Sequence, residues 1–175
     1  MTSQWGPWAI AIGVALAAVF AVVGAPEVDA PLGRGAVAPA FSLPRVGGEP
    51  VSLEGLRGQV VLVNFWATWC KPCEDEMPAM ERLYQALRDE GLELLAISVD
   101  DEASVVEAFG ERLNLTFPLL LDPAKDVADA YQTFRFPESF LIDREGTVVE
   151  RYIGPKEWDA AAYEDRIRRL LQSRG

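Results

Sequence analysis

The sequence predicts an α/β domain in which helices cover both faces of a mixed sheet. Three observations lead to this fold class. Val60–Trp66 is a continuous apolar run of strand length, which is typical of a central strand buried on both faces, and Leu92–Val99 is a second run that predicts a buried strand. Between these runs, from Lys71 to about Arg88, apolar residues recur at helical spacing. Strand and helix patterns then keep alternating to the end of the chain.

Shorter patterns predict the other elements in chain order. A turn at Gly47-Gly48 precedes a short strand over 50–53, which indicates a hairpin ahead of the first long strand. Gly91 ends the helix that follows that strand. The remaining predicted elements are a helix over 103–113, a strand over 117–121, a short helix over 125–133, strands over 139–142 and 148–153 joined by a turn at 143–146, and a helix over 158–171.

Composition sets the size of the protein and excludes several function classes. The chain has 175 residues and 50% of them are apolar, which suits one domain with a proper core and a short additional segment. It contains no histidine, which excludes Ser-His-Asp triads, Cys-His proteases and histidine-based zinc sites. Two cysteines are too few for a four-cysteine zinc site or a disulfide-stapled scaffold. A net charge of −11 disfavours nucleic-acid binding, because phosphate contacts need clustered Lys and Arg.

The N-terminal segment has the composition of a membrane anchor. Trp5–Pro26 contains no charged residue and reaches the roughly 20 residues that a membrane-spanning helix needs. A cleaved signal and a buried helix are the alternatives, but the run is long for a signal core and lacks a polar face. We therefore predict an anchor, or else a signal, over 1–26, a linker over 27–38 and the folded domain over 39–175. The first basic residue is Arg34, so flanking charges only weakly favour a cytoplasmic domain.

Cys70 and Cys73 form a motif with a specific chemistry. They follow the first long strand and begin the next helix, at a spacing that lets them close a small disulfide ring. The helix N-terminus and the charge of Lys71 favour the thiolate of Cys70, which is the attacking species in disulfide exchange. Cys73 lies one turn into the helix and is expected to be less exposed, so that Cys70 attacks a partner and Cys73 resolves the mixed disulfide. Pro72, at the helix start, costs no hydrogen bond.

Three other interpretations of this cysteine pair are weaker. The chain offers no second pair of zinc ligands, and Glu74 follows Cys73 where a haem attachment motif has histidine. A structural staple of so short a loop would add little stability. A cysteine pair between a strand and a helix is typical of redox motifs, so we predict thiol–disulfide chemistry.

The stretch from Asn64 to Cys73 resembles the active site of thioredoxin-fold proteins. The most similar subgroup is the membrane-anchored TlpA, ResA and CcmG (DsbE)-like thiol–disulfide oxidoreductases, over about residues 39–171. Pro78 matches the helix-kinking proline of this family, and Phe136–Asp143 resembles its segment with a cis-proline. The resemblance implies a thioredoxin-like fold with an N-terminal β-hairpin and, at about 100–125, a central strand–helix insertion.

The same resemblance implies a function. Members of the subgroup act outside the cytoplasm and reduce disulfides of partner proteins, usually apocytochrome c or a copper-site protein of cytochrome oxidase. We therefore expect a protein-disulfide reductase in the periplasm or on the outer face of the cytoplasmic membrane. This expectation outweighs the charges flanking the N-terminal run, which weakly favour a cytoplasmic domain. A transmembrane thiol electron donor would re-reduce the Cys70–Cys73 disulfide. We expect no metal, no organic cofactor, no nucleic-acid partner, and a monomeric protein.

Two polar residues near the cysteines have open roles. Glu76 resembles a glutamate implicated in proton chemistry in ResA-like members, but it could instead be one of three first-turn acids, Glu74–Glu76, that complement the helix dipole. Asn64 stands where thioredoxin proper has a buried acid, and a neutral amide cannot be that base. Asn64 is therefore either a hydrogen-bonded core residue or a residue that tunes the site.

The resemblance also suggests the surface that binds a partner. Pro137 would be cis and would present the backbone of Phe136 to a partner strand. Phe136 is larger than the usual residue there, which affects substrate preference. Glu138 faces the site in CcmG-like members and could here equally be exposed, and Trp69 is expected in an apolar rim around Cys70. The assigned residues are Cys70, Cys73, Glu76 and Pro137 for catalysis, and Trp69, Pro72, Phe136 and Glu138 for substrate binding.

Other functions stay open at this point. The protein could be a disulfide oxidase or isomerase, because the dipeptide between the cysteines does not fix the sign of the reaction. It could be a Cu(I) carrier, since two thiolates can hold a soft metal ion, although no Met or His cluster supports this. A peroxiredoxin is disfavoured, because no Pro–Thr peroxidatic pattern precedes Cys70.

Overall fold

The computed structural model describes residues 31–173. The anchor predicted over 1–26 and the first part of the predicted linker lie outside the described residues. Among residues 31–173, no helix is both long enough and apolar enough to cross a membrane. Packing begins at Leu32 rather than at residue 39, since Leu32 and Ala38 are buried and the backbone N–H of Gly35 donates to the carbonyl of Val148. The end of the predicted linker is therefore part of the domain.

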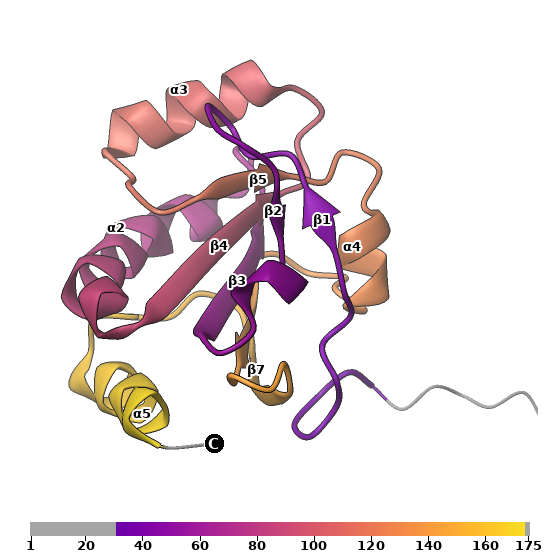
Figure 1. Ribbon diagram of the computed structural model, residues 1–175. Coiled ribbons are helices and arrows are strands. Elements are labelled where there is room, and N and C mark those ends of the chain that lie inside the picture. Colours follow the sequence, from indigo (N-terminus) through magenta and orange to yellow (C-terminus); the bar gives the residue numbers. More distant parts are fainter. Residues whose placement is uncertain (1–30, 174–175) are drawn as a thin grey trace, which may run out of the picture. The chain divides into compact units, whose positions relative to one another are not determined.

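A five-stranded mixed sheet forms the centre of the domain (Figure 1). Its central strand β3 (Val60–Trp66) pairs in parallel with β4 (Leu92–Ser98), and β4 pairs in parallel with the short β5 (Leu119–Leu121). On its other side β3 pairs antiparallel with β6 (Glu138–Ile142), which pairs antiparallel with β7 (Val148–Ile153). All seven residues of β3 are buried, as the continuous apolar run predicted.

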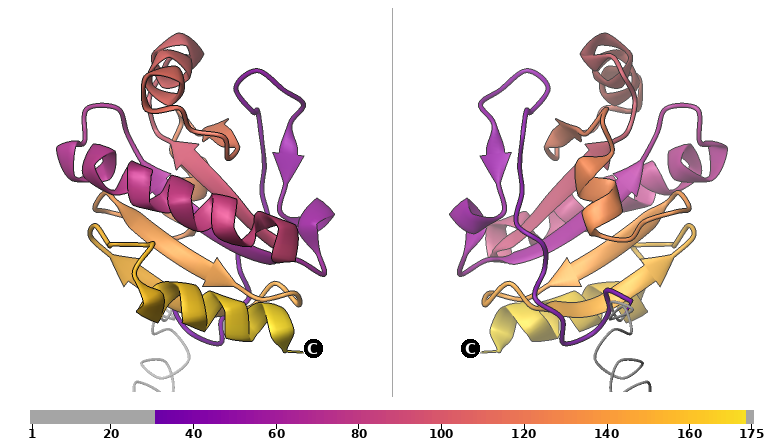
Figure 2. Two further views of the ribbon diagram at one scale, coloured as in Figure 1. Left: turned by 90° about the vertical axis from the view of Figure 1, so that its left-hand side faces the viewer. Right: turned by 90° about the vertical axis from the view of Figure 1, so that its right-hand side faces the viewer.

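The helices lie on both faces of this sheet, which confirms the predicted thioredoxin-like α/β class. Figure 2 shows α2 (Lys71–Leu87) and α5 (Ala161–Gln172) over one face and α4 (Asp126–Ala130) over the other. Helix α3 (Ala103–Leu113) joins β4 to β5 and is tied to α2 by an ion pair between Arg112 and Glu74.

A separate two-stranded ribbon precedes the sheet. It consists of β1 (Ser42–Leu43) and β2 (Val51–Ser52), which pair antiparallel and are followed by the 3-10 turn η1 (Glu54–Leu56). This confirms the predicted N-terminal hairpin. A second 3-10 turn, η2 (Arg88–Glu90), ends at Gly91 in a left-handed conformation, where the sequence predicted the end of the helix.

Three predicted elements differ from the structure by two or more residues at one end. The helix predicted over 125–133 shortens to α4, because Lys125 and Gln132 adopt left-handed conformations with φ of 63° and 53°. The last helix begins at Ala161 and not at Trp158, whose indole is buried ahead of the helix. The strand predicted from residue 117 begins only after Pro118, which has no N–H to donate to a ladder.

The fold places the two cysteines by fixing the strand and the helix on either side of them. Met77, Met80 and Leu83 are fully or almost fully buried and anchor the inner side of α2. Phe65 of β3 packs against Tyr131 and Phe140, with ring centroids 5.2 and 6.0 Å away. The short loop 67–70 between these packed elements therefore has little freedom to move.

Candidate active site

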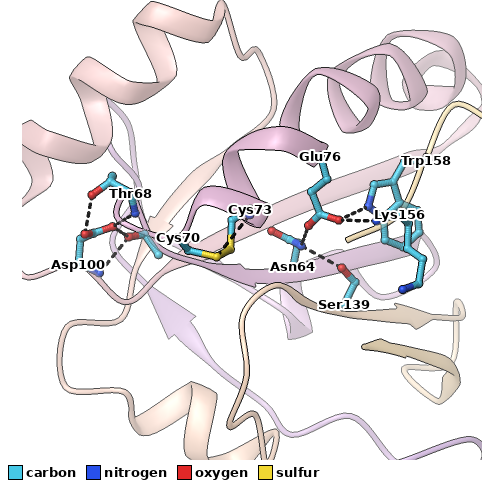
Figure 3. The surroundings of a disulfide bond; sticks show 10 residues. Asn64, Thr68, Cys70, Cys73, Glu76, Asp100, Ser139, Lys156 and Trp158 are labelled. Carbon is cyan, nitrogen blue, oxygen red and sulfur yellow. Dashed lines mark hydrogen bonds between the residues drawn. A yellow bond between two sulfur atoms is a disulfide. The ribbon is translucent and has the colours of Figure 1, made fainter. Parts of the chain in front are cut away.

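Cys70 and Cys73 form a disulfide between the end of β3 and the first turn of α2 (Figure 3). Their Cα atoms are 5.3 Å apart. Cys70 is the N-cap residue of α2, and its Sγ accepts a hydrogen bond of 3.3 Å from the backbone N–H of Cys73. Cys70 retains 7% exposure whereas Cys73 has none, so the residue at the helix N-cap is the more exposed of the two. This geometry favours a thiolate at Cys70.

The charge of Lys71 contributes less to the cysteines than the sequence suggested. Its exposed ammonium pairs with Asp75 at 2.6 Å and lies 3.8 Å from Glu74. These carboxylates raise the pKa of Lys71, chiefly through the hydrogen bond that its ammonium donates to Asp75. Because its charge is shared with acids on the same helix face, stabilisation of a Cys70 thiolate depends mainly on the backbone N–H groups of the helix start.

Glu76 is buried, unlike its neighbours Glu74 and Asp75, so the first-turn surface role does not apply to it. Its Oε1 accepts a 2.9 Å hydrogen bond from Asn64 Nδ2, and its Oε2 accepts 3.0 Å bonds from Trp158 Nε1 and from the backbone N–H of Lys156. Burial raises the pKa of the Glu76 carboxyl to about 7, and the three hydrogen bonds act in the opposite direction. The site therefore contains a carboxyl that titrates near neutral pH.

Asn64 connects this carboxylate to the sheet. It lies in the middle of β3 with no exposed surface, and its Nδ2 also donates a 2.9 Å hydrogen bond to Ser139 Oγ of the adjacent β6. In the view of Figure 3, the network of Asn64, Glu76, Ser139 and Trp158 lies on one side of the disulfide.

An apolar rim borders the accessible cysteine. The peptide bond between Phe136 and Pro137 is cis, as the resemblance implied. Trp69 is 68% exposed and contacts Phe136 edge-on, with ring centroids 6.1 Å apart. Pro72 is exposed in the first turn of α2. These residues give the surface around Cys70 both apolar contact area and an ordered backbone edge.

Glu138 is neither exposed nor free to meet a partner. It is 2% exposed and pairs with Arg151 at 2.5 Å, where Arg151 also donates to the carbonyls of Leu32 and Gln132. Glu138 and Arg151 form part of the wall of a small cavity of about 130 Å³ that Phe134 and other residues also line. The predicted direct contact of Glu138 with substrate is therefore replaced by an ion pair that supports the segment before Pro137.

Asp100 holds the loop before Cys70, a role that sequence reasoning missed. Its Oδ2 accepts hydrogen bonds from the backbone N–H of Thr68 (2.8 Å) and from Ser98 Oγ (2.7 Å), and its Oδ1 accepts one from Thr68 Oγ1 (2.8 Å). In the sequence, Asp100 stands just ahead of the helix predicted over 103–113, where an acid is typical. The available signal was a pair of polar residues, Ser98 and Asp100, at the carboxyl end of a buried strand.

Comparisons with known proteins agree with this geometry. Residues 34–151 match the AhpC/TSA family. The chain is 43% identical over 120 residues to the thiol-disulfide oxidoreductase ResA of Geobacillus kaustophilus and 40% identical to that of Bacillus cereus, covering 69% of each protein and of this chain. A solved thiol:disulfide interchange protein of the thioredoxin family from Chlorobium tepidum superimposes with a TM-score of 0.69 at 28% identity, over 79% of this chain and 97% of that one.

The Asp100 contacts give a first testable prediction. Replacing Asp100 with Ala leaves three hydrogen-bond donors without their acceptor, so we expect the free energy of unfolding to fall by about 3 kcal/mol. The rate at which iodoacetamide alkylates reduced Cys70 should change as well, because Thr68 is no longer fixed. Asp101, which is exposed, is the matched control. Equal effects of Asp100→Ala and Asp101→Ala in urea unfolding would contradict this assignment.

Glu76 gives a second prediction, about the pH dependence of stability. The folded protein holds the Glu76 proton up to about pH 7, whereas a glutamate in the unfolded chain has a pKa of about 4.5. The folded state thus binds more protons between these values, so this stabilisation is complete below pH 4.5 and is lost as pH rises to 7. We expect Glu76 to account for a loss of about 3 kcal/mol across that window.

The measurement is urea unfolding of the wild type and of Glu76→Gln between pH 4.5 and 7.5. The difference between the two proteins should show the fall, because glutamine does not titrate. Glu74→Gln is the control, because Arg112 lowers the pKa of Glu74 and gives its contribution the opposite sign. A wild-type curve parallel to that of Glu76→Gln would disprove the near-neutral titration.

Proposed function

The chain belongs to the AhpC/TSA family and is a thioredoxin-like thiol–disulfide oxidoreductase, and on this premise we propose that it reduces disulfides of partner proteins through Cys70 and Cys73. The observation that supports the roles of the two cysteines most directly is their asymmetry. Cys70 caps a helix and keeps a small exposed area, whereas Cys73 is fully buried one turn further on. An accessible thiolate and a buried resolving thiol are what a reductase needs.

The proposed cycle has two exchange steps. The Cys70 thiolate attacks one sulfur of the partner disulfide, and the other partner sulfur leaves as a thiolate. Cys73 then loses its proton and attacks Cys70 in the mixed disulfide, which releases the second partner sulfur and leaves the Cys70–Cys73 disulfide. Glu76 lies three residues after Cys73 on the same helix and titrates near neutral pH, so it is suited to take up that proton.

The rim around Cys70 is the proposed binding surface for the partner. Trp69 and Phe136 supply apolar contact area, and the cis peptide at Pro137 shapes the backbone against which an extended partner segment pairs. Pro72 completes the rim at the helix start. This surface suits a partner segment that is unfolded or extended around its cysteines.

The proposed setting of this activity rests on the resemblance to the ResA-like subgroup. We place the domain in the periplasm or on the outer face of the cytoplasmic membrane, attached through residues 1–26. The proposed substrates are apocytochrome c or a copper-site protein, and a transmembrane thiol donor would supply the electrons. The support is the uncharged N-terminal run and the relatives named ResA.

The cysteine roles are tested by trapping. Cys73→Ser should accumulate a mixed disulfide with a disulfide-bonded test protein such as insulin, because the resolving thiol is missing. Cys70→Ser, the matched control, should form none. The adducts are resolved on non-reducing gels and located by mass spectrometry. Adducts of Cys70→Ser through Cys73 would reverse the assignment.

The direction of the reaction is tested by the midpoint potential of the Cys70–Cys73 couple, measured against glutathione. We expect a value near or below that of thioredoxin, about −270 mV, because a reductase needs a dithiol that is readily oxidised. A value near about −120 mV, that of a strong disulfide oxidant, would show that the protein donates disulfides.

A further inference from the structure

Asn64 carries a buried oxygen whose role the proposed cycle does not explain. Asn64 has no exposed surface, and its Oδ1 has no hydrogen-bond donor among the residues that the structure describes. Its Nδ2 is held from two directions, by Glu76 Oε1 and Ser139 Oγ, each at 2.9 Å. When Glu76 is ionised, a rotated amide would direct Oδ1 at a carboxylate oxygen that can only accept, so these contacts then fix the oxygen on the opposite side. In the view of Figure 3, the oxygen of Asn64 points toward Cys73.

A buried acceptor without a donor is unfavourable, and such groups are rare in folded proteins. The disulfide sulfurs carry no proton and cannot donate to Asn64. Reduction changes this, because it creates an S–H group, which is a hydrogen-bond donor. The unpaired oxygen therefore points toward a residue whose sulfur becomes a donor in one redox state only.

We propose that Asn64 Oδ1 accepts a hydrogen bond from the Cys73 thiol in the reduced protein, and that it thereby stabilises the reduced state and keeps the proton on Cys73. The two sulfurs then have opposite surroundings. Cys70 Sγ faces a donor, the backbone N–H of Cys73, whereas Cys73 faces an acceptor. The pair is thus set up as one thiolate and one thiol.

The redox step that this describes is balanced. A partner dithiol, with one sulfur as thiolate and the other protonated, gives two electrons to the Cys70–Cys73 disulfide and becomes a disulfide itself. The protein gains one thiolate, at Cys70, and one thiol, at Cys73, so the single proton passes from the partner to the buried sulfur. The proposal depends on redox cycling of the cysteine pair and not on the direction in which it works physiologically.

The test compares redox equilibria of full-length variants with glutathione. Asn64→Ala should lower the equilibrium constant for reduction about tenfold, which corresponds to a midpoint potential about 30 mV more negative. The pKa of the Cys73 thiol, followed by NMR of its Cβ, should fall, because the protonated form loses its acceptor. Ser139→Ala removes the other partner of Nδ2 and leaves Oδ1 in place, so it should change the equilibrium constant less than about twofold.

A second background separates a direct effect from one that acts through Glu76. In Glu76→Gln protein, the shift caused by Asn64→Ala should persist. Its disappearance there, or an unchanged equilibrium constant in Asn64→Ala, would overturn the proposal. If Asn64→Ala fails to fold, the hydrogen bond between Asn64 and Cys73 is tested by NMR of the wild-type protein. The Cγ resonance of Asn64 should move on reduction and titrate with the Cys73 thiol, and a resonance indifferent to both would refute the contact.

Discussion

One buried carboxylate joins the segments that surround the disulfide. Glu76 projects from α2 and binds Asn64 of β3 and the 156–158 segment that leads into α5. A carboxylate is costly to bury unless hydrogen bonds replace its water, and here three donors, from β3 and from the 156–158 segment, offset part of that cost. The helix that carries both cysteines is thereby fixed to the central strand and to the C-terminal part of the fold.

The sequence predicted the elements whose signals are local. The apolar run of β3, the helical periodicity of α2 and the cysteine pair between them place the site without any long-range information. The cis state of Pro137 came from family resemblance, because a generic X–Pro bond gives no such signal. The predicted end of the helix over 125–133 was wrong because Gln132 adopts a positive φ. A residue that is not glycine gives no sequence signal of that conformation.

Side-chain roles were less predictable, because they depend on contacts between residues far apart in sequence. Glu74 and Glu76 look alike in a first turn, yet Glu76 alone of the two meets Trp158, 82 residues away. Asp100 looked like a helix-start acid, whereas it accepts hydrogen bonds from Thr68, 32 residues earlier. Lys71 appeared beside Cys70 in sequence, but its charge is paired with acids along the helix. Reasoning from neighbouring positions therefore overestimated the effect of Lys71 on Cys70. It also missed the long-range contacts of Glu76 and Asp100.

The contacts of Arg151 with Leu32, Gln132 and Glu138 give the domain a mechanical property. Leu32 is held by both its backbone groups, since its N–H donates to Gln132 Oε1 and its carbonyl accepts from Arg151. Arg151 in turn holds Glu138, the residue that follows the cis-proline. A pulling force that enters the domain at Leu32 is therefore transmitted through Arg151 of β7 to Glu138 of β6, beside the proposed partner-binding edge. Tension applied at Leu32 would thus act on the sheet edge that is proposed to hold the partner.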